Sequence, residues 1–98
     1  MRKETELMEL KSIITKNLDV CYVCGKPRQQ FHHAIGAAYR KKSEKYGLIV
    51  PICEQCHREV HDSPDQKLNK KLKADAESKF LMIYSYDTWM KTFHKNYL

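Results

Sequence analysis

The sequence predicts a small α+β domain that is stabilised by a bound zinc ion and has helices at both ends. Three observations lead to this class. The chain has 98 residues, which is enough for one domain with a modest core. Its four cysteines form two Cys-x-x-Cys pairs, which are Cys21 with Cys24 and Cys53 with Cys56. A single short aliphatic run, residues 48–50, stands among segments of helical periodicity, so strands and helices are both expected.

We expect one domain over residues 1–98, arranged in three successive regions. The first region, residues 1–17, contains a helix over 3–17, because its apolar residues recur at helical spacing with charges between them. The second region, residues 18–63, combines the cysteine pairs with two strands and one helix. Its predicted elements are a strand over 29–33, a basic loop over 36–47, a strand over 48–50 ended by Pro51, and a helix from near Cys53 to before Ser63.

The third region, residues 64–98, has the periodicity of two helices. The apolar stripe of the first helix consists of Leu68, Leu72, Ala76, Phe80 and either Ile83 or Tyr84. Ser85 or Asp87 is suited to cap the second helix, because both side chains accept hydrogen bonds from the free backbone N–H groups of a first turn. That helix carries Trp89, Met90, Phe93 and Tyr97.

Composition limits the classes of protein to which the chain can belong. The N-terminus mixes charges and has no apolar stretch of the kind that secretory signals contain, and no apolar run approaches 18 residues. We therefore expect a cytoplasmic protein with no membrane partner, in a reducing compartment where paired cysteines bind metal more often than each other. The formal net charge of +6 favours a polyanionic partner.

The two cysteine pairs predict one structural zinc site, with Cys21, Cys24, Cys53 and Cys56 as its four ligands. Two residues between cysteines allow both thiolates to reach one ion, and two such pairs complete a tetrahedron. Four thiolates leave no open coordination position, so this site is expected to stabilise the fold and to do no chemistry. The alternative is two redox or disulfide pairs.

Four of the five histidines lie close to the cysteines in the sequence. His57 and His61 are four residues apart in the predicted helix, so both rings project from one face and can share an ion. His32 or His33 can supply a third ligand from the preceding strand. Adjacent residues of a strand point to opposite faces, so only one of these two can bind the ion and the other remains free beside it.

A metal ion with three histidine ligands, open positions and a free imidazole nearby is a constellation suited to hydrolysis. The alternative is that His57 replaces one cysteine at the structural zinc while His32 and His33 are solvated surface residues. His94 lies outside this group and is expected to be a surface histidine.

These motifs resemble the HNH, or ββα-metal, nuclease family, and in particular its small phage-type members with two zinc knuckles. The residues that carry the resemblance are Phe31-His32-His33, then Leu48-Ile49-Val50-Pro51-Ile52-Cys53, then Cys56-His57 and His61. The likeness covers residues 21–61 and includes the basic segment 40–47. It implies a ββα-metal core and a cytoplasmic location in a bacterial or phage-infected cell.

The resemblance also implies a role for each histidine. His33 takes the place of the general base, His32 that of the first metal ligand, and His57 and His61 those of the ligands on the helix. The implied cofactors are Zn²⁺ at the structural site and Mg²⁺ or another divalent metal at the catalytic site. The chain departs from the family at Leu48, near which the family's central asparagine is expected.

Basic residues near the histidines fit a nucleic-acid substrate. Arg40 or Arg58 would stabilise the extra negative charge that develops on a phosphate during hydrolysis. Lys41, Lys42 and Lys45, together with Arg40, would contact the DNA backbone without reading sequence. The alternative for these lysines is a solvated loop.

The function expected from the sequence is therefore a metal-dependent HNH endonuclease that hydrolyses DNA phosphodiester bonds, with low sequence specificity. Two alternatives remain open. One is a non-catalytic zinc module that binds nucleic acid or a protein partner. The other is a structural subunit of a larger phage or mobile-element assembly.

Overall fold

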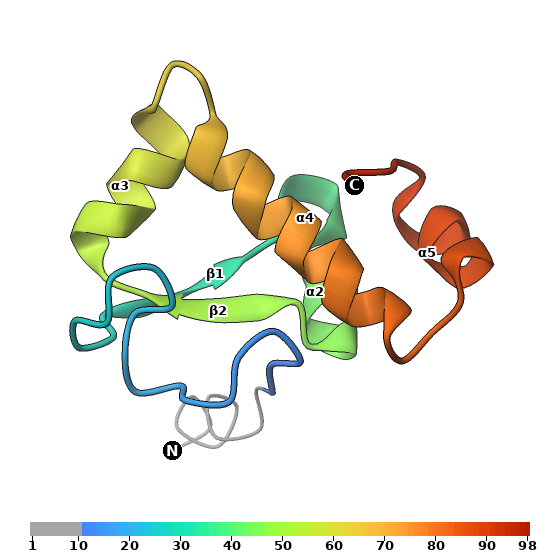
Figure 1. Cartoon of the computed structure of the whole chain (residues 1–98), viewed down its shortest axis with the longest axis horizontal. Helices are drawn as coiled ribbons and strands as arrows, with labels where there is room; N and C mark the ends of the chain where they lie inside the picture. Colours follow the sequence, from blue (N-terminus) through green and yellow to red (C-terminus); the bar gives the residue numbers. More distant parts are fainter. Residues whose placement is uncertain (1–10) are drawn as a thin grey trace.

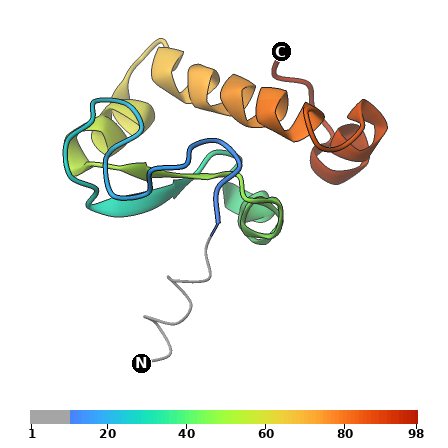
Figure 2. The same ribbon diagram turned by 60° about the horizontal axis from the view of Figure 1, so that its bottom comes forward.

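The computed structural model describes residues 11–98, which form a small α+β unit with one two-stranded antiparallel sheet and four α-helices. The elements in chain order are β1 (Gln30–His33), the 3-10 turn η1 (Ala37–Tyr39), α2 (Arg40–Tyr46), β2 (Ile49–Ile52), α3 (Glu54–Asp62), α4 (Lys67–Leu81) and α5 (Tyr86–Phe93). Helix α4 runs along one side of the molecule, from the end of α3 to the start of α5 (Figures 1 and 2). No helix in this described part is long and apolar enough to cross a membrane.

The hairpin of β1 and β2 places the histidine pair opposite a buried aliphatic strand. His32 pairs with Val50 and His33 with Ile49. All four residues of β2 are buried, which explains its continuous apolar sequence. The expected strand over 29–33 is confirmed, with Gln30 as its first residue.

The expectation that Pro51 ends the second strand is wrong, because Pro51 lies inside β2 and pairs with Phe31. The N–H of Ala34 donates to the carbonyl of Leu48, and hydrogen-bonded pairs alternate along an antiparallel ladder. By this alternation Phe31 and Pro51 form a pair whose backbone groups point away from each other. The missing N–H of proline is therefore not needed at this position.

The predicted helix over 3–17 is wrong for its described part, because residues 11–17 form bends and irregular backbone; the remainder lies outside the described residues. Two donors of this segment bond to β2 and to the residue that ends α2. Ser12 Oγ donates to the carbonyl of Ile49 (2.6 Å), and the N–H of Ile13 donates to Gly47 (2.9 Å). Ser12 Oγ also accepts from the N–H of Ile14, so a local side-chain bond competes with helix formation.

The predicted basic loop over 36–47 is also wrong, because most of it is helical in η1 and α2. Gly47 ends α2 in the left-handed conformation, with φ of 74°, and its N–H bonds to carbonyls of the last turn. Ser43 is fully buried and donates from Oγ to the carbonyl of Ile35, which fixes α2 against the chain that follows β1. The helix is difficult to predict from the sequence, because most of its residues are charged and Ser43 is the one that is buried.

The three later helices are present as predicted, except that α5 ends at Phe93 and does not carry Tyr97, because His94 adopts the left-handed conformation that ends the helix. Cys53 caps α3 and Ser85 caps α5, where Ser85 Oγ accepts from the N–H of Thr88 (3.1 Å). The stripe of α4 is buried at Leu72, Ala76 and Phe80, but it does not continue to Ile83, which is 59 % exposed because α4 ends at Leu81. Tyr84 instead packs its ring on Phe80, at 4.6 Å between centroids.

Two hydrophobic clusters fill the interior. The larger one joins the hairpin to α4 and α5; its buried members are Ile14, Ala34, Ile35, Leu48, Val50, Ala76, Phe80, Trp89 and Phe93. The smaller one lies under the cysteines; its buried members are Cys21, Ile52, Cys53, Cys56, Val60 and Leu72. Because α3 and α4 contribute to the smaller cluster, it fixes the helix that carries two of the candidate histidines relative to the cysteines.

Candidate metal centres

The four cysteines converge where the first knuckle, the turn over residues 21–25, meets the start of α3. Their sulfur atoms all lie within 4.8 Å of one another, and the Sγ atoms of Cys24 and Cys53 are 3.6 Å apart. A tetrahedral zinc with bonds of about 2.3 Å holds its sulfurs roughly 3.8 Å apart, whereas a disulfide bond is about 2.05 Å long. This spacing fits a shared metal ion, as the sequence predicts.

Local backbone geometry explains why both pairs point inward. In the first knuckle, Gly25 has φ of 82° and its N–H donates to the carbonyl of Cys21, which closes a tight turn. In the second, Cys53 occupies the N-cap of α3 and its Sγ accepts from the N–H of Cys56. A thiolate at a helix N-terminus is stabilised by the free backbone N–H groups there.

The electrostatics of the sulfurs also favour a cation. Burial alone would raise the pKa of Cys21, but hydrogen bonds from the backbone of Cys24, Cys53 and Val23 lower it to about 6. A hydrogen bond from the backbone of Cys56 similarly lowers the pKa of Cys53. Burial and the neighbouring sulfurs raise the pKa of Cys56. Four thiolates this close repel one another, and a divalent cation would remove that repulsion.

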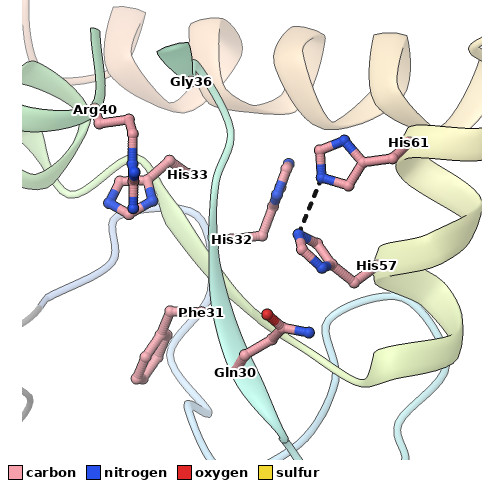
Figure 3. A pocket seen from close by; sticks show the side chains of 8 residues that line it. All are labelled: Gln30, Phe31, His32, His33, Gly36, Arg40, His57 and His61. Atoms are coloured by element: carbon pink, nitrogen blue, oxygen red, sulfur yellow. Dashed lines mark hydrogen bonds between the residues drawn. The ribbon is translucent and has the colours of Figure 1, made fainter. Parts of the chain in front are cut away.

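A second group consists of His32 from β1 and His57 and His61 from α3, whose ring nitrogens also lie within 4.8 Å of one another. The Nε2 atoms of His57 and His61 are 3.1 Å apart, and the ring of His32 faces both, with centroid distances of 5.3 and 5.8 Å (Figure 3). Nitrogens bound at about 2.1 Å to one tetrahedral ion would be roughly 3.4 Å apart. His57 is therefore grouped with the other histidines and not with the cysteines.

His32 provides the strongest evidence that this group fits a metal. It is 8 % exposed, and its Nε2 is buried with no hydrogen-bond partner among residues 11–98. An unpaired buried nitrogen is costly unless a ligand satisfies it. Burial, followed by the charges of His57, His61, His33 and Lys73, lowers the pKa of His32 to about 4. At neutral pH the ring is therefore uncharged, and its Nε2 can donate an electron pair to a metal ion. Three imidazole ligands suit a transition metal better than Mg²⁺.

His33 lies on the other side of β1 from His32, next to α2 (Figure 3). Its Nε2 is 2.6 Å from Oε2 of Glu44, and its side chain is 16 % exposed. The alternation expected for adjacent strand residues is therefore present, and His33 is separate from the three histidines that converge. The sequence interpretation missed Glu44, because it treated residues 36–47 as a loop.

Of the two arginines expected to stabilise charge on a phosphate, one lies beside the histidines and the other does not. Arg40 lines a cleft of about 330 Å³ together with His33 and the three clustered histidines. Arg58 is not among the residues that line this cleft; its guanidinium pairs with Glu54 at 3.3 Å on the exposed face of α3. Only Arg40 of the two arginines is therefore placed to meet a bound phosphate.

The three lysines of α2 are exposed, but they do not share one direction. Lys41 lies with Arg40 and Glu44 along a shallow depression on the surface. Lys42 donates to the carbonyl of Thr92 (3.3 Å), and the Nζ of Lys45 is 5.4 Å from the centroid of the Tyr46 ring. Arg40 therefore belongs to both the cleft and this neighbouring depression, where Lys41 lies, while the other two lysines cover other parts of the fold.

Comparison of the chain with protein-family models, curated proteins and solved structures gives no significant match. The geometry of the two groups therefore carries the functional argument. The chain has four clustered cysteines and three clustered histidines, each group able to hold one metal ion.

Proposed function

We propose that this protein is a metal-dependent endonuclease of the HNH type, which hydrolyses DNA phosphodiester bonds. One observation carries the proposal: His32, His57 and His61 converge, with the Nε2 of His32 buried and unpaired among the described residues, while His33 lies outside this group and contacts Glu44. A binding module has no need for this division of roles. Hydrolysis needs both a metal and a separate base.

The elements that carry these residues support an HNH-type core. The resemblance implies two antiparallel strands followed by a helix, with one metal ligand on the first strand and two on the helix. In this chain β1, β2 and α3 follow in that order, with His32 on β1 and the other two ligands on α3. The cysteine site, with Zn²⁺, would hold the start of α3 against the first knuckle.

In the proposed mechanism His33 acts as the general base. A proton on Nε2, donated to Glu44, leaves the lone pair of Nδ1 available to take a proton from water. The carboxylate then stabilises the imidazolium that forms. A divalent ion bound by His32, His57 and His61 would polarise the phosphate and stabilise the leaving oxygen.

Arg40 supports the same step. It lines the cleft together with His33, and a guanidinium pairs well with phosphate oxygens. Lys41, in the neighbouring depression that Arg40 also lines, adds a second cation for a DNA backbone next to the cleft. No second sequence-reading unit is visible in residues 11–98, so we propose contacts that do not depend on sequence.

One observation favours the non-catalytic alternative, a zinc module that binds nucleic acid or a protein. Leu48 occupies the position near which the family has its asparagine, and it is fully buried in the larger cluster. This chain therefore lacks the polar group that the family uses to brace its catalytic loop. In our proposal the contact of Glu44 with His33 takes over that function.

The deciding experiment is a plasmid-nicking assay with Mg²⁺, Mn²⁺, Ni²⁺ or Zn²⁺, run on the parent and on His33→Ala. We expect the variant to keep its zinc, fold and DNA affinity and to lose cleavage by about 10²–10⁴-fold. His57→Ala and His61→Ala should lose activity that excess metal partly restores. If His33→Ala cleaves like the parent while His32→Ala is inactive and not rescued, their roles are reversed. If no protein nicks DNA with any ion, the binding module is correct.

A further inference from the structure

A second cavity of about 330 Å³ adjoins the histidine group on the side of α4. It shares His32, His33, Gly36 and His61 with the cleft that Arg40 lines, so the two hollows are neighbouring parts of one site. Its other walls include Ile35, Tyr39, Asn69, Lys73 and Tyr97. A group bound there would be next to whatever the clustered histidines hold.

Two half-buried tyrosines give this cavity an aromatic character. Tyr39 packs edge-on against Phe93, with centroids 5.7 Å apart, and Tyr97 packs edge-on against Trp89 at 6.3 Å. Both partner rings belong to the larger hydrophobic cluster, so the tyrosines are held by the core. Rings fixed in this way can stack a flat ligand with little further loss of conformational freedom.

Tyr97 is held in place by a buried carboxylate. Glu77 of α4 is fully buried, and its Oε1 accepts from the backbone N–H of Tyr97. Trp89 Nε1 donates to the carbonyl of Lys95 (2.8 Å), which fixes the same segment to α5. Burying a carboxyl group is costly unless it is hydrogen-bonded. Within the described residues Glu77 has this one hydrogen bond, which holds the backbone of Tyr97 at the wall of the cavity.

The polar groups of the cavity suit the edge of a heteroaromatic ring. Lys73 lies with its Nζ 5.3 Å from the centroid of the Tyr97 ring. Asn69 donates from Nδ2 to Gln66, so its carbonyl oxygen remains available to a ligand. The described lining contains no acidic residue, so a polyanionic chain can enter without repulsion from a carboxylate. Aromatic faces beside cations and amides are typical of sites for unpaired bases.

We propose that this cavity binds one unpaired nucleobase, on the nucleotide next to the phosphate that the histidine group engages. The inference rests on the proposed function and specifies its substrate. A base inside a duplex is paired and stacked on both faces, so it must be unpaired and unstacked before it can enter a pocket in the protein. DNA with a single-stranded or locally unpaired segment at the cleavage position avoids this cost and is accordingly the preferred substrate.

The test is binding of oligonucleotides that carry the fluorescent base 2-aminopurine, scanned through successive positions. The protein is the zinc-loaded full chain with His33→Ala, so that the DNA remains intact. We expect a change in fluorescence with a single strand and with a duplex that has one unpaired base, and a weaker response with the matched duplex. Tyr97→Ala should weaken binding of the unpaired DNA by about 5–100-fold, and Tyr97→Phe should not.

The matched control is Tyr86→Ala, which removes an exposed tyrosine that does not line the cavity. It should bind like the parent. The proposal is overturned if the matched duplex binds equally well and Tyr97→Ala has no effect. If the parent nicks no DNA but the fluorescence change that depends on Tyr97 is still observed, the protein has the base site and is not a nuclease. A chain that nicks matched duplex as fast as single strands, with Tyr97→Ala fully active, is a nuclease without the base site.

Discussion

His33 on β1 and Glu44 on α2 contact each other through Nε2 and Oε2 at 2.6 Å. The contact links a strand to a short charged helix, and it gives His33, which lies outside the converging group, a fixed partner. A carboxylate on one ring nitrogen selects the tautomer whose other nitrogen can accept a proton.

The first prediction concerns Glu44. Glu44→Gln should lower kcat of DNA cleavage by about 10–100-fold and leave KM unchanged, because the amide no longer fixes the ring or stabilises its positive charge. Single-turnover and steady-state cleavage on the same DNA measure this split. Glu54→Gln is the control, since Glu54 pairs with Arg58 away from the cleft. Equal loss in both variants would contradict a specific role for Glu44.

The second prediction concerns zinc. Purified protein should contain at least one zinc per chain that resists mild chelation, and its removal should unfold the smaller cluster, because that cluster contains three of the four cysteines. Cys56→Ser should lose both the metal and the fold. Metal analysis combined with thermal unfolding tests this. Metal-free protein that stays folded with four titratable thiols would refute it.

The third prediction is a dependence of stability on pH that arises from His32. Its folded pKa of about 4 lies below the ordinary value of 6.5, so the fold prefers the neutral ring. The contribution is therefore present above pH 6.5 and is lost as the pH falls towards 4. We expect the parent to lose on the order of 2 kcal/mol more than His32→Leu over this range. Denaturant unfolding of zinc-loaded proteins at several pH values measures the difference. Identical pH profiles would show that His32 is not buried as described.

The fourth prediction concerns Arg40 and Lys41. The affinity for DNA should fall with salt, because Arg40 and Lys41 release counterions when they contact phosphates. Arg40→Ala and Lys41→Ala should each reduce the slope of log affinity against log salt by about one. Lys42→Ala is the comparison, since its ammonium already bonds to Thr92, and it should change the slope less. A flat salt response of the parent would remove the nucleic-acid interpretation.

The fifth prediction uses two glycines with similar backbone geometry. Gly25 and Gly47 both have positive φ, at 82° and 74°. A Cβ on Gly25 would meet nothing within 4 Å, whereas on Gly47 it would lie 3.2 Å from Ile13 and from the carbonyl of Lys11. Gly25→Ala should cost about 1 kcal/mol of stability, and Gly47→Ala more. Chemical denaturation compares them, and equal losses would indicate that Ile13 can move aside.

The sequence predicted the elements whose signal is local. The start of α3, the Ser85 cap of α5, the buried stripe of α4 and the four-residue spacing of His57 and His61 depend on neighbours along the chain, and they appear as expected. The prediction failed where contacts between distant residues decide the structure. Residues 11–17 have helical periodicity, but Ser12 donates to Ile49 of β2 and the N–H of Ile13 donates to Gly47.

The candidate site shows the same distinction between features set by neighbours along the chain and features set by contacts between distant residues. The alternation of His32 and His33 follows from strand geometry alone. The contact of Glu44 with His33 could have been found only by recognising α2, which places Glu44 four residues after Arg40 on one face. The walls of the second cavity come from η1, α4 and the segment after α5. Their meeting depends on how the helices pack, and no pattern along the chain encodes it.

The outer edge of β2 has a consequence for how copies of this chain can associate. Its outward carbonyls at Ile49 and Pro51 already accept from Ser12 and from the N–H of Tyr22, and Pro51 offers no donor. A strand from another molecule would find both of these carbonyls occupied and one donor missing, so it cannot form a regular ladder on this side. This edge of the sheet is thus protected against edge-to-edge growth, which is the common route by which exposed hairpins aggregate.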